Sequence, residues 1–331
     1  MKTSKETKTE TRSNGILDGR PIAGPLAKVT DDVGAGARVR IAKAYKMFVG
    51  GAFVRSESGR YFQVTSAAAA EANVEPETVK IPRGSRKDVR DAVLAAKNAE
   101  AGWAARTAFN RGQILYRLAE VLESRAGELE ASLVRSGVSP RAATAEVAAT
   151  VDRAVFYAGF ADKYHALLAS SNPVAGPHFG FSVPEPLGVV AAVAPRRPAL
   201  LGLASVALPI ATGGNTCVVL ASEDDPRTAI VFSECLATSD MPGGVVNVLT
   251  GHPKELGPVM AKHREVFGLD IWVDEPSLTK QIEELGADNI KRVKIHAGLT
   301  AAEWTDERRG QGLSWIERFL ETKTVWHPVG V

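Results

Sequence analysis

The chain has 331 residues, of which 45% are hydrophobic and 24% charged, a composition typical of soluble globular proteins with one or two cores. Its 40 basic and 38 acidic residues give a formal net charge of +2, so the charge balance does not favour nucleic acid or an anionic membrane as a partner. Aromatic residues make up only 6%, and no basic stretch is interleaved with them, which argues against a stacking platform for single strands.

The cysteines and the apolar runs exclude further classes of protein. Cys217 and Cys235 are the two cysteines, neither lies in a CxxC pattern, and the histidines are few and scattered. A disulfide framework and a metal site are therefore not expected. The first residues contain no apolar segment of the kind that marks a secretory signal, and the apolar run 198–211 is too short to span a bilayer. These features predict a cytoplasmic protein.

We expect folded structure to begin near Lys46. Residues 1–44 are polar and Gly-rich, which predicts a flexible tail. KMFVGGAF then reads as a small hairpin around a Gly-Gly turn. From residue 45 to residue 300 we expect one main domain.

Helices dominate the next part of the chain. SRKDVRDAVLAAKNAEAGWAA predicts a helix capped by Ser85. The next helix carries its apolar residues on one face: Ile114, Leu115, Leu118, Val121 and Leu122. A third helical stretch is expected over 142–168, with aromatic side chains that favour a core role over a site role.

Strands and helices alternate after a Gly- and Pro-containing arm at about 172–186. GVVAAVA, at 188–194, is a continuous apolar run, as in a strand buried on both faces. Further strands are expected at 216–221, 245–250, 268–273 and 292–297, with helices between them at 198–212, 227–237, 253–263 and 277–285. This alternation predicts an α/β fold with a doubly wound parallel, Rossmann-like sheet, preceded by N-terminal helices.

The last residues, 301–331, predict a short linker and a terminal strand. WIERFLE indicates a short amphipathic helix that runs into TKTVWHPV. A strand that follows a completed sheet needs an edge to pair with.

Several of these segments resemble the aldehyde dehydrogenase superfamily. The resemblance begins at KMFVGGAFVRSESGRYF and continues through ILYRLAEVLESRAGELE, VFYAGFADK, PEPLGVVAAVAP, GGNTCVVLASE and MPGGVVNVLTG. It covers the chain from about Lys46 to Gly298 and resumes at WIERFLETKTVW, which is similar to the family's terminal oligomerisation strand. The resemblance implies the family's cofactor-binding half and its β-strand oligomerisation arm.

The family's catalytic domain has no room in this chain. Family members insert it, with its nucleophilic cysteine, between the fifth strand and the terminal strand. Here about fifteen residues, Leu299 to Leu313, fill that interval. Cys217 falls in an expected buried strand and Cys235 on an expected helix, so both are interpreted as small core residues. No catalytic residue is therefore expected.

Two further family positions are changed. The family's Pro-Trp-Asn becomes Pro195, Arg196 and Arg197. The arginines could stabilise an oxyanion, but with no nucleophile the favoured interpretation is that they solvate this surface or pair with carboxylates across an interface. His296 stands at the family's general-base glutamate, where we favour a surface or hydrogen-bonded role.

The dinucleotide site is similarly altered. The resemblance leaves Val193, Pro195, Ser222 and Glu223 as weak, vestigial cofactor-binding residues, while Leu220 replaces the ribose-binding lysine. Asp274 and Glu275 stand in the family's Phe-Thr-Gly-Ser turn, where their carboxylates would repel a pyrophosphate from a helix N-terminus. We therefore expect no cofactor, or only weak binding of NAD(P).

The layout resembles the cysteine-lacking second region of long, two-part aldehyde dehydrogenases. The first hypothesis is a non-catalytic subunit that binds a full-length aldehyde dehydrogenase paralogue, or itself, through strand addition. The alternatives are a component with residual NAD(P) binding whose partner supplies the cysteine, and a dinucleotide sensor. For the terminal strand, pairing with another chain is favoured over folding back of Val325 and Trp326 onto the chain's own arm.

Overall fold

The computed structural model describes residues 41–65 and 77–330. The expected flexible tail, residues 1–44, lies outside these ranges except for residues 41–44. Ala44–Val331 form one compact unit. None of the helices described could cross a membrane, because none combines the necessary length with sufficient apolarity.

A seven-stranded sheet forms the centre of this unit, in the order β11-β10-β7-β8-β9-β1-β2. Five strands are parallel, as predicted: β7 (Val189–Val193), β8 (Thr216–Leu220), β9 (Val246–Leu249), β10 (Gly268–Ile271) and β11 (Arg292–Ile295). The predicted hairpin, β1 (Met47–Val49) and β2 (Ala52–Val54), extends the sheet antiparallel beyond β9. The sheet is therefore parallel in its doubly wound part and mixed at one edge.

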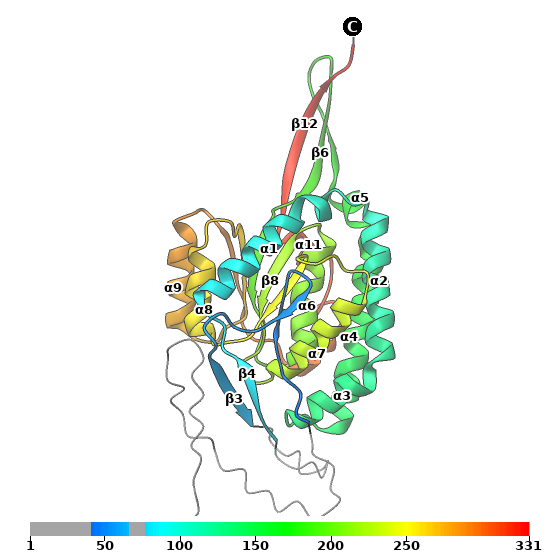
Figure 1. Cartoon of the computed structure of the whole chain (residues 1–331). Coiled ribbons are helices and arrows are strands. Elements are labelled where there is room, and N and C mark those ends of the chain that lie inside the picture. Colours follow the sequence, from blue (N-terminus) through cyan, green and yellow to red (C-terminus); the bar gives the residue numbers. More distant parts are fainter. Residues whose placement is uncertain (1–40, 66–76, 331) are drawn as a thin grey trace, which may run out of the picture. The chain divides into compact units, whose positions relative to one another are not determined.

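Helices cover both faces of the sheet (Figure 1). On one face lie α1 (Arg86–Ala104), α8 (Pro253–Lys262) and α9 (Pro276–Ala287); on the other lie α2 (Ala108–Ser124), α4 (Pro140–Phe160), α6 (Ala199–Thr212) and α7 (Pro226–Thr238). Successive residues of β7 serve the two cores in turn, because Val189 packs with the first layer and Val190 with the second. This alternation explains why GVVAAVA is apolar without a break.

Local sequence signals place the helix ends. Ser85 accepts a hydrogen bond from the backbone of Asp88, whose side chain accepts from the backbone of Ser85, so the predicted cap is a complete capping box. The expected single helix over 142–168 is wrong. It divides into α4 and a short α5 (Tyr164–Leu168), and Tyr164 turns into the core with 1% of its surface exposed. Helix α3 (Ala126–Arg135) lies between α2 and α4 in the chain.

A second hairpin, β3 (Tyr61–Thr65) and β4 (Thr78–Pro82), was not predicted from the sequence. Ile81 is fully buried and packs with Ile230 of α7 in a small separate cluster. These strands are too short and carry too many polar residues for the sequence to show a clear strand pattern.

The arm is a three-stranded antiparallel sheet in the order β12-β6-β5, formed by β5 (Ser170–Asn172), β6 (His178–Pro186) and β12 (Leu320–Pro328). In Figure 1 it extends away from the helices. Val325 pairs with Phe181 and Trp326 with Gly180 of the same chain. The favoured interpretation, in which the terminal strand pairs with another chain, is thus corrected. β12 folds back and pairs one of its edges with β6 of its own chain, because β6 offers a complementary edge nine residues long within reach. Its other edge is unpaired in the sheet order.

The interval between β11 and β12 contains two short helices, α10 (Ala301–Thr305) and α11 (Leu313–Glu317). We call residues 299–319 the strap. Trp304, Trp315 and Phe319 of the strap are almost fully buried against the body of the unit. The strap is therefore a packed part of the fold and not a loose connection.

Candidate functional site

The carboxyl ends of the parallel strands border a cleft of about 410 Å³. Three of the four predicted cofactor residues line it, Val193 from the end of β7 and Ser222 and Glu223 from the loop after β8. The fourth, Pro195, is buried and packs against Gly202 of α6, outside the residues that line the cleft. Residues predicted separately from the sequence thus meet at the topological switch point of the sheet, where such folds bind ligands.

Ion pairs within the chain cross the mouth of this cleft. Arg196 makes a two-bond contact with Asp224, with Nη2–Oδ1 at 2.6 Å and Nε–Oδ2 at 3.0 Å, and lies 3.8 Å from Glu223. His252 lies 3.1 Å from the same Glu223. Glu223, one of the predicted vestigial cofactor-binding residues, therefore already faces two side chains of its own protein.

The two arginines that replace the family's Trp-Asn pair have partners in their own chain. The Arg196 side chain is 67% exposed, so its bond with Asp224 is well solvated. Arg197 is exposed and donates to the backbone carbonyl of Ser136 at 3.0 Å. The contacts agree with the interpretation that these residues solvate the surface, while pairing across an interface stays a prediction.

The N-terminus of α9 carries the changed pyrophosphate turn. Glu275 is the N-cap residue and its carboxylate lies 3.1 Å from Lys254 of α8. Pro276 occupies the first helical position and has no backbone N–H to donate. Asp274 lines the cleft beside them. A negative charge and a missing donor thus stand at the helix end that would otherwise attract an anion.

A stack of rings borders the cleft at Trp272. Trp272 lines the cleft and lies face to face with the imidazole of His296, with ring centroids 3.9 Å apart and planes 5° apart. Trp315 of the strap continues the stack at 5.6 Å from Trp272. His296 Nε2 lies 2.5 Å from Oδ1 of Asp270, and both side chains are buried. The hydrogen-bonded alternative for His296 is therefore correct, and the surface alternative is wrong.

Arg153 of α4 holds the strap from beneath. Its side chain is buried, and it donates to Ser205 Oγ at 2.6 Å, to the carbonyl of Trp304 at 2.7 Å and to the carbonyl of Gly310. Burial lowers the pKa of this guanidinium. Nothing in the sequence pattern indicated this role, because Arg153 lies in a helix whose other residues read as ordinary core and surface.

Both cysteines lie in the core, as predicted. Burial raises the pKa of Cys217 to about 12 and that of Cys235 to about 11. Neither side chain can supply a thiolate near neutral pH. Among the residues described, no group of three or more His, Cys, Asp or Glu side chains is arranged to hold a metal ion.

Glu146 is a further residue near the site that the sequence analysis missed. Its Oε1 accepts from the backbone N–H of Leu200 at 2.8 Å and of Leu201 at 3.2 Å, at the start of α6. Burial raises the pKa of this carboxyl. Only the packing of α4 against α6 brings these residues together, so sequence spacing carried no signal for it.

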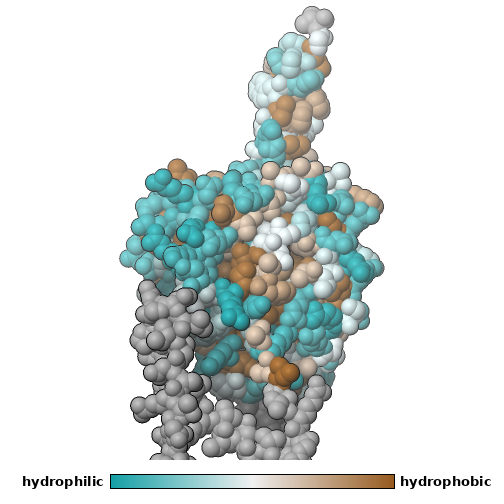
Figure 2. All heavy atoms as spheres, viewed as in Figure 1, coloured by the Kyte–Doolittle hydropathy of each residue, from teal (hydrophilic) through white to brown (hydrophobic). Residues whose placement is uncertain are grey.

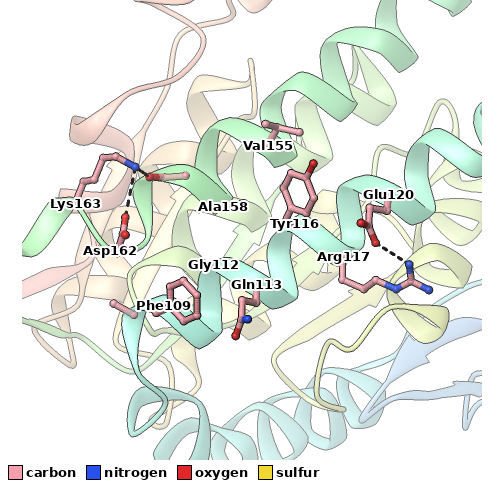
Figure 3. A pocket seen from close by; sticks show the side chains of 12 residues that line it. Phe109, Gly112, Gln113, Tyr116, Arg117, Glu120, Val155, Ala158, Asp162 and Lys163 are labelled. Carbon is pink, nitrogen blue, oxygen red and sulfur yellow. Dashed lines mark hydrogen bonds and ion pairs between the residues drawn. The ribbon is translucent and has the colours of Figure 1, made fainter.

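A larger cavity of about 560 Å³ lies elsewhere, between α2 and α4. Figure 3 shows Phe109 and Tyr116 along it, with the Arg117–Glu120 and Lys163–Asp162 ion pairs towards its two sides. None of the predicted site residues lines this cavity. Its charged side chains neutralise one another, and we assign it no role.

Comparison with known proteins identifies the relatives of this fold. A model of the family described as "Aldehyde dehydrogenase family" matches residues 53–302. A hydroxyisobutyraldehyde dehydrogenase of Mycolicibacterium austroafricanum is 33% identical over 82% of this chain and 52% of its own length. Human retinal dehydrogenase 2 is 30% identical over 77% of this chain and 49% of its own length.

The solved structures agree with the sequence comparisons. An NAD-dependent aldehyde dehydrogenase from Sinorhizobium meliloti is similar with a TM-score of 0.70 and 27% identity, over 77% of this chain and 50% of that one. The chain spans about half the length of the curated relatives it matches.

Proposed function

The chain belongs to the aldehyde dehydrogenase family, and on that premise we propose that it is a non-catalytic subunit that assembles with a full-length aldehyde dehydrogenase and supports or regulates it. The observation that carries the proposal is the strap. Between β11 and β12, where relatives carry the domain with the nucleophile, this chain has residues packed onto the end of its own sheet. Covalent catalysis needs an activated nucleophile, and both thiols of the chain are buried and protonated.

We further propose that the subunit binds NAD(P) weakly or not at all. A dinucleotide needs room at both ends of the cleft and donors for its pyrophosphate. Here Trp272, stacked on His296, lines the cleft as a bulky wall residue, and Glu275 with Pro276 stands at the helix end that would otherwise attract an anion. The residues present therefore do not fit the whole cofactor.

Association with a partner can be tested directly. Native mass spectrometry of the tagged protein, isolated from its own cells, should show a full-length aldehyde dehydrogenase in a fixed ratio with this chain. Recovery of the chain alone, or only as a homo-oligomer, would argue against the subunit role.

A second candidate function is a working component with residual cofactor binding, or a dinucleotide sensor. The convergence of Val193, Ser222 and Glu223 on one open cleft favours it, as does the NAD dependence of the Sinorhizobium meliloti relative. Titration of the isolated chain with NADH, followed by nucleotide fluorescence, separates the candidates. A Kd below about 100 μM, which corresponds to about 5.5 kcal/mol, would favour this second function.

A further inference from the structure

A pocket of about 530 Å³ lies at the root of the arm, apart from the cofactor-type cleft. The end of α1, the start of α2, the short helix α5 and the last residues of β6 surround it. Figure 1 shows α1, α5 and the root of β6 meeting in this region. The volume falls in the range of small-molecule sites.

Arg111 of α2 is the unusual residue of this pocket. It lines the pocket, yet only 4% of its surface is exposed. Nη1 donates to the carbonyl of Arg106 at 2.6 Å, and Nη2 donates to Tyr164 Oη at 3.0 Å. Nε is buried with no hydrogen-bond partner. Part of this guanidinium thus ties the α1–α2 turn together, and part of it is unused.

The charge of Arg111 is also uncompensated. Among residues 41–65 and 77–330, no carboxylate forms an ion pair with it. A buried cation without a counterion is costly, because the surrounding protein cannot replace its hydration. The structure therefore places a positive charge in the pocket wall without its negative partner.

The other ionisable groups of the pocket add to this positive character. Arg106 is exposed at the rim, and its Nη1 donates only to the neutral side chain of Asn110, at 2.7 Å. Glu185 is the one carboxylate of the lining, and Lys323 of β12 pairs with it at 2.8 Å. Tyr164 and His165 are the remaining titratable groups; burial raises the pKa of Tyr164, whereas burial, and then the charge of Arg111, lower the pKa of His165. A negatively charged ligand is what this set of side chains lacks.

The rest of the lining is apolar, with alanines from α1 and α2 and prolines from β6. We propose that this pocket binds a small carboxylate with an apolar body, its carboxylate against Arg111 and Arg106 and its body against the alanines and prolines. A planar guanidinium matches a carboxylate in shape and hydrogen-bond geometry. The inference does not rest on the proposed function, because it concerns a different pocket and needs no partner.

Calorimetric titration with sodium benzoate, at constant ionic strength, tests the proposal on the full chain. We expect saturable binding with a Kd below about 1 mM, and no binding of the uncharged analogue benzyl alcohol. Non-saturable binding, or equal binding of benzyl alcohol, would overturn the proposal. Tighter binding of inorganic phosphate than of benzoate would overturn the assignment to carboxylates.

Variants at exposed positions localise the site without disturbing the buried Arg111. Arg106→Gln should weaken benzoate binding at least about fivefold. Ala105→Glu places a carboxylate on the pocket rim and should abolish binding while the chain stays folded by thermal unfolding. Arg117→Gln, on the same helix as Arg111 but outside this pocket, is the matched control and should bind benzoate like the unaltered chain. Unchanged binding in both pocket variants would exclude this pocket as the site.

Discussion

The Asp270–His296 pair illustrates how a residue at a known family position can have a different role in this chain. A histidine at the family's general-base position invites a catalytic interpretation, but here its ring is enclosed between Trp272 and a buried carboxylate. Proton transfer to a substrate requires contact with the substrate, which this enclosure prevents. His296 therefore supports Trp272 in the wall of the cleft.

Arg153 should matter more for the strap than for any other part of the chain. Arg153→Met removes the donors to the carbonyls of Trp304 and Gly310, which stay buried. We expect a loss of about 2 kcal/mol in the free energy of unfolding in urea, and faster amide hydrogen exchange over residues 300–312.

Arg117→Met is the control for this prediction, because Arg117 is exposed and pairs only with its neighbour Glu120 in α2. It should change the stability by less than about 0.5 kcal/mol. Equal protection of the strap in both variants would show that Arg153 does not hold it.

The cysteine thiols give a prediction that depends on pH. With a pKa of about 11, Cys235 has a thiolate fraction of only ~0.001 at pH 8, so the native chain should resist alkylation there. The folded-state pKa values lie above the ordinary value of 9.0. The resulting stabilisation is therefore fully present below about pH 9 and is lost as the pH rises through about 11 to 12.

Mass spectrometry after iodoacetamide treatment measures this reactivity. Alkylation of both thiols should be complete in urea and nearly absent in buffer at pH 8. Rapid labelling of either native thiol would contradict its placement in the core and would reopen the question of a nucleophile in this chain.

At the scale of elements, α9 shows how three residues at a helix start affect both its stability and its suitability for an anion. Acidic residues before a helix stabilise its N-terminus, and proline suits its first position. The sequence Asp274, Glu275, Pro276 thus makes a well-formed helix start, and the same residues oppose an anionic ligand. The proposed weakness of cofactor binding thus has the same physical origin as the stability of this helix start.

The paired substitution Asp274→Gly and Glu275→Ser tests this origin. Removing both carboxylates frees Lys254 and the helix end, so NADH affinity should rise about tenfold, equivalent to about 1.4 kcal/mol, in a fluorescence titration. The pair Glu283→Ser and Glu284→Ser removes the same charge farther along α9 and should leave the affinity unchanged. A similar gain in both pairs would point to net charge and not to the helix end.

At the scale of the whole molecule, the arm carries an exposed outer strand and exposed aromatic side chains. Its outer strand β12 is exposed over most of its length, and Phe179 and Trp326 are 51% and 63% exposed. Figure 2 shows apolar residues interspersed with polar ones along the arm. An unpaired strand edge with exposed aromatic residues is suited to sheet extension by another chain.

Trp326→Asp should therefore act on assembly more than on folding. We expect the complex with the partner aldehyde dehydrogenase to be lost, so that the mass of this chain measured by light scattering falls to that of a single chain, with the circular dichroism spectrum unchanged. Leu94→Asp, at a 58% exposed position on α1, is the control and should leave the assembly intact. An assembly that survives Trp326→Asp would exclude this edge as the interface.

Periodicity and motifs in the sequence were enough to predict the central sheet and most of the long helices, but not the β3–β4 hairpin or the short helix α10. Apolar runs predict the parallel strands, their order along the chain and the core placement of both cysteines. Local capping chemistry predicts the cap at Ser85. The grouping of Val193, Ser222 and Glu223 also follows, because parallel strands bring their carboxyl ends to one edge. These are consequences of near-neighbour patterns along the chain.

Only the tertiary structure decided which residues far apart in the chain meet. It placed Arg153 under the strap, Glu146 at the start of α6, Trp272 on His296, and β12 on β6. The sequence analysis predicted most of the elements that carry these contacts but not the contacts themselves, and it expected the terminal strand to pair elsewhere. Such contacts depend on side-chain packing between separate elements, which leaves no period in the sequence, so burial and partner geometry became visible only in the folded chain.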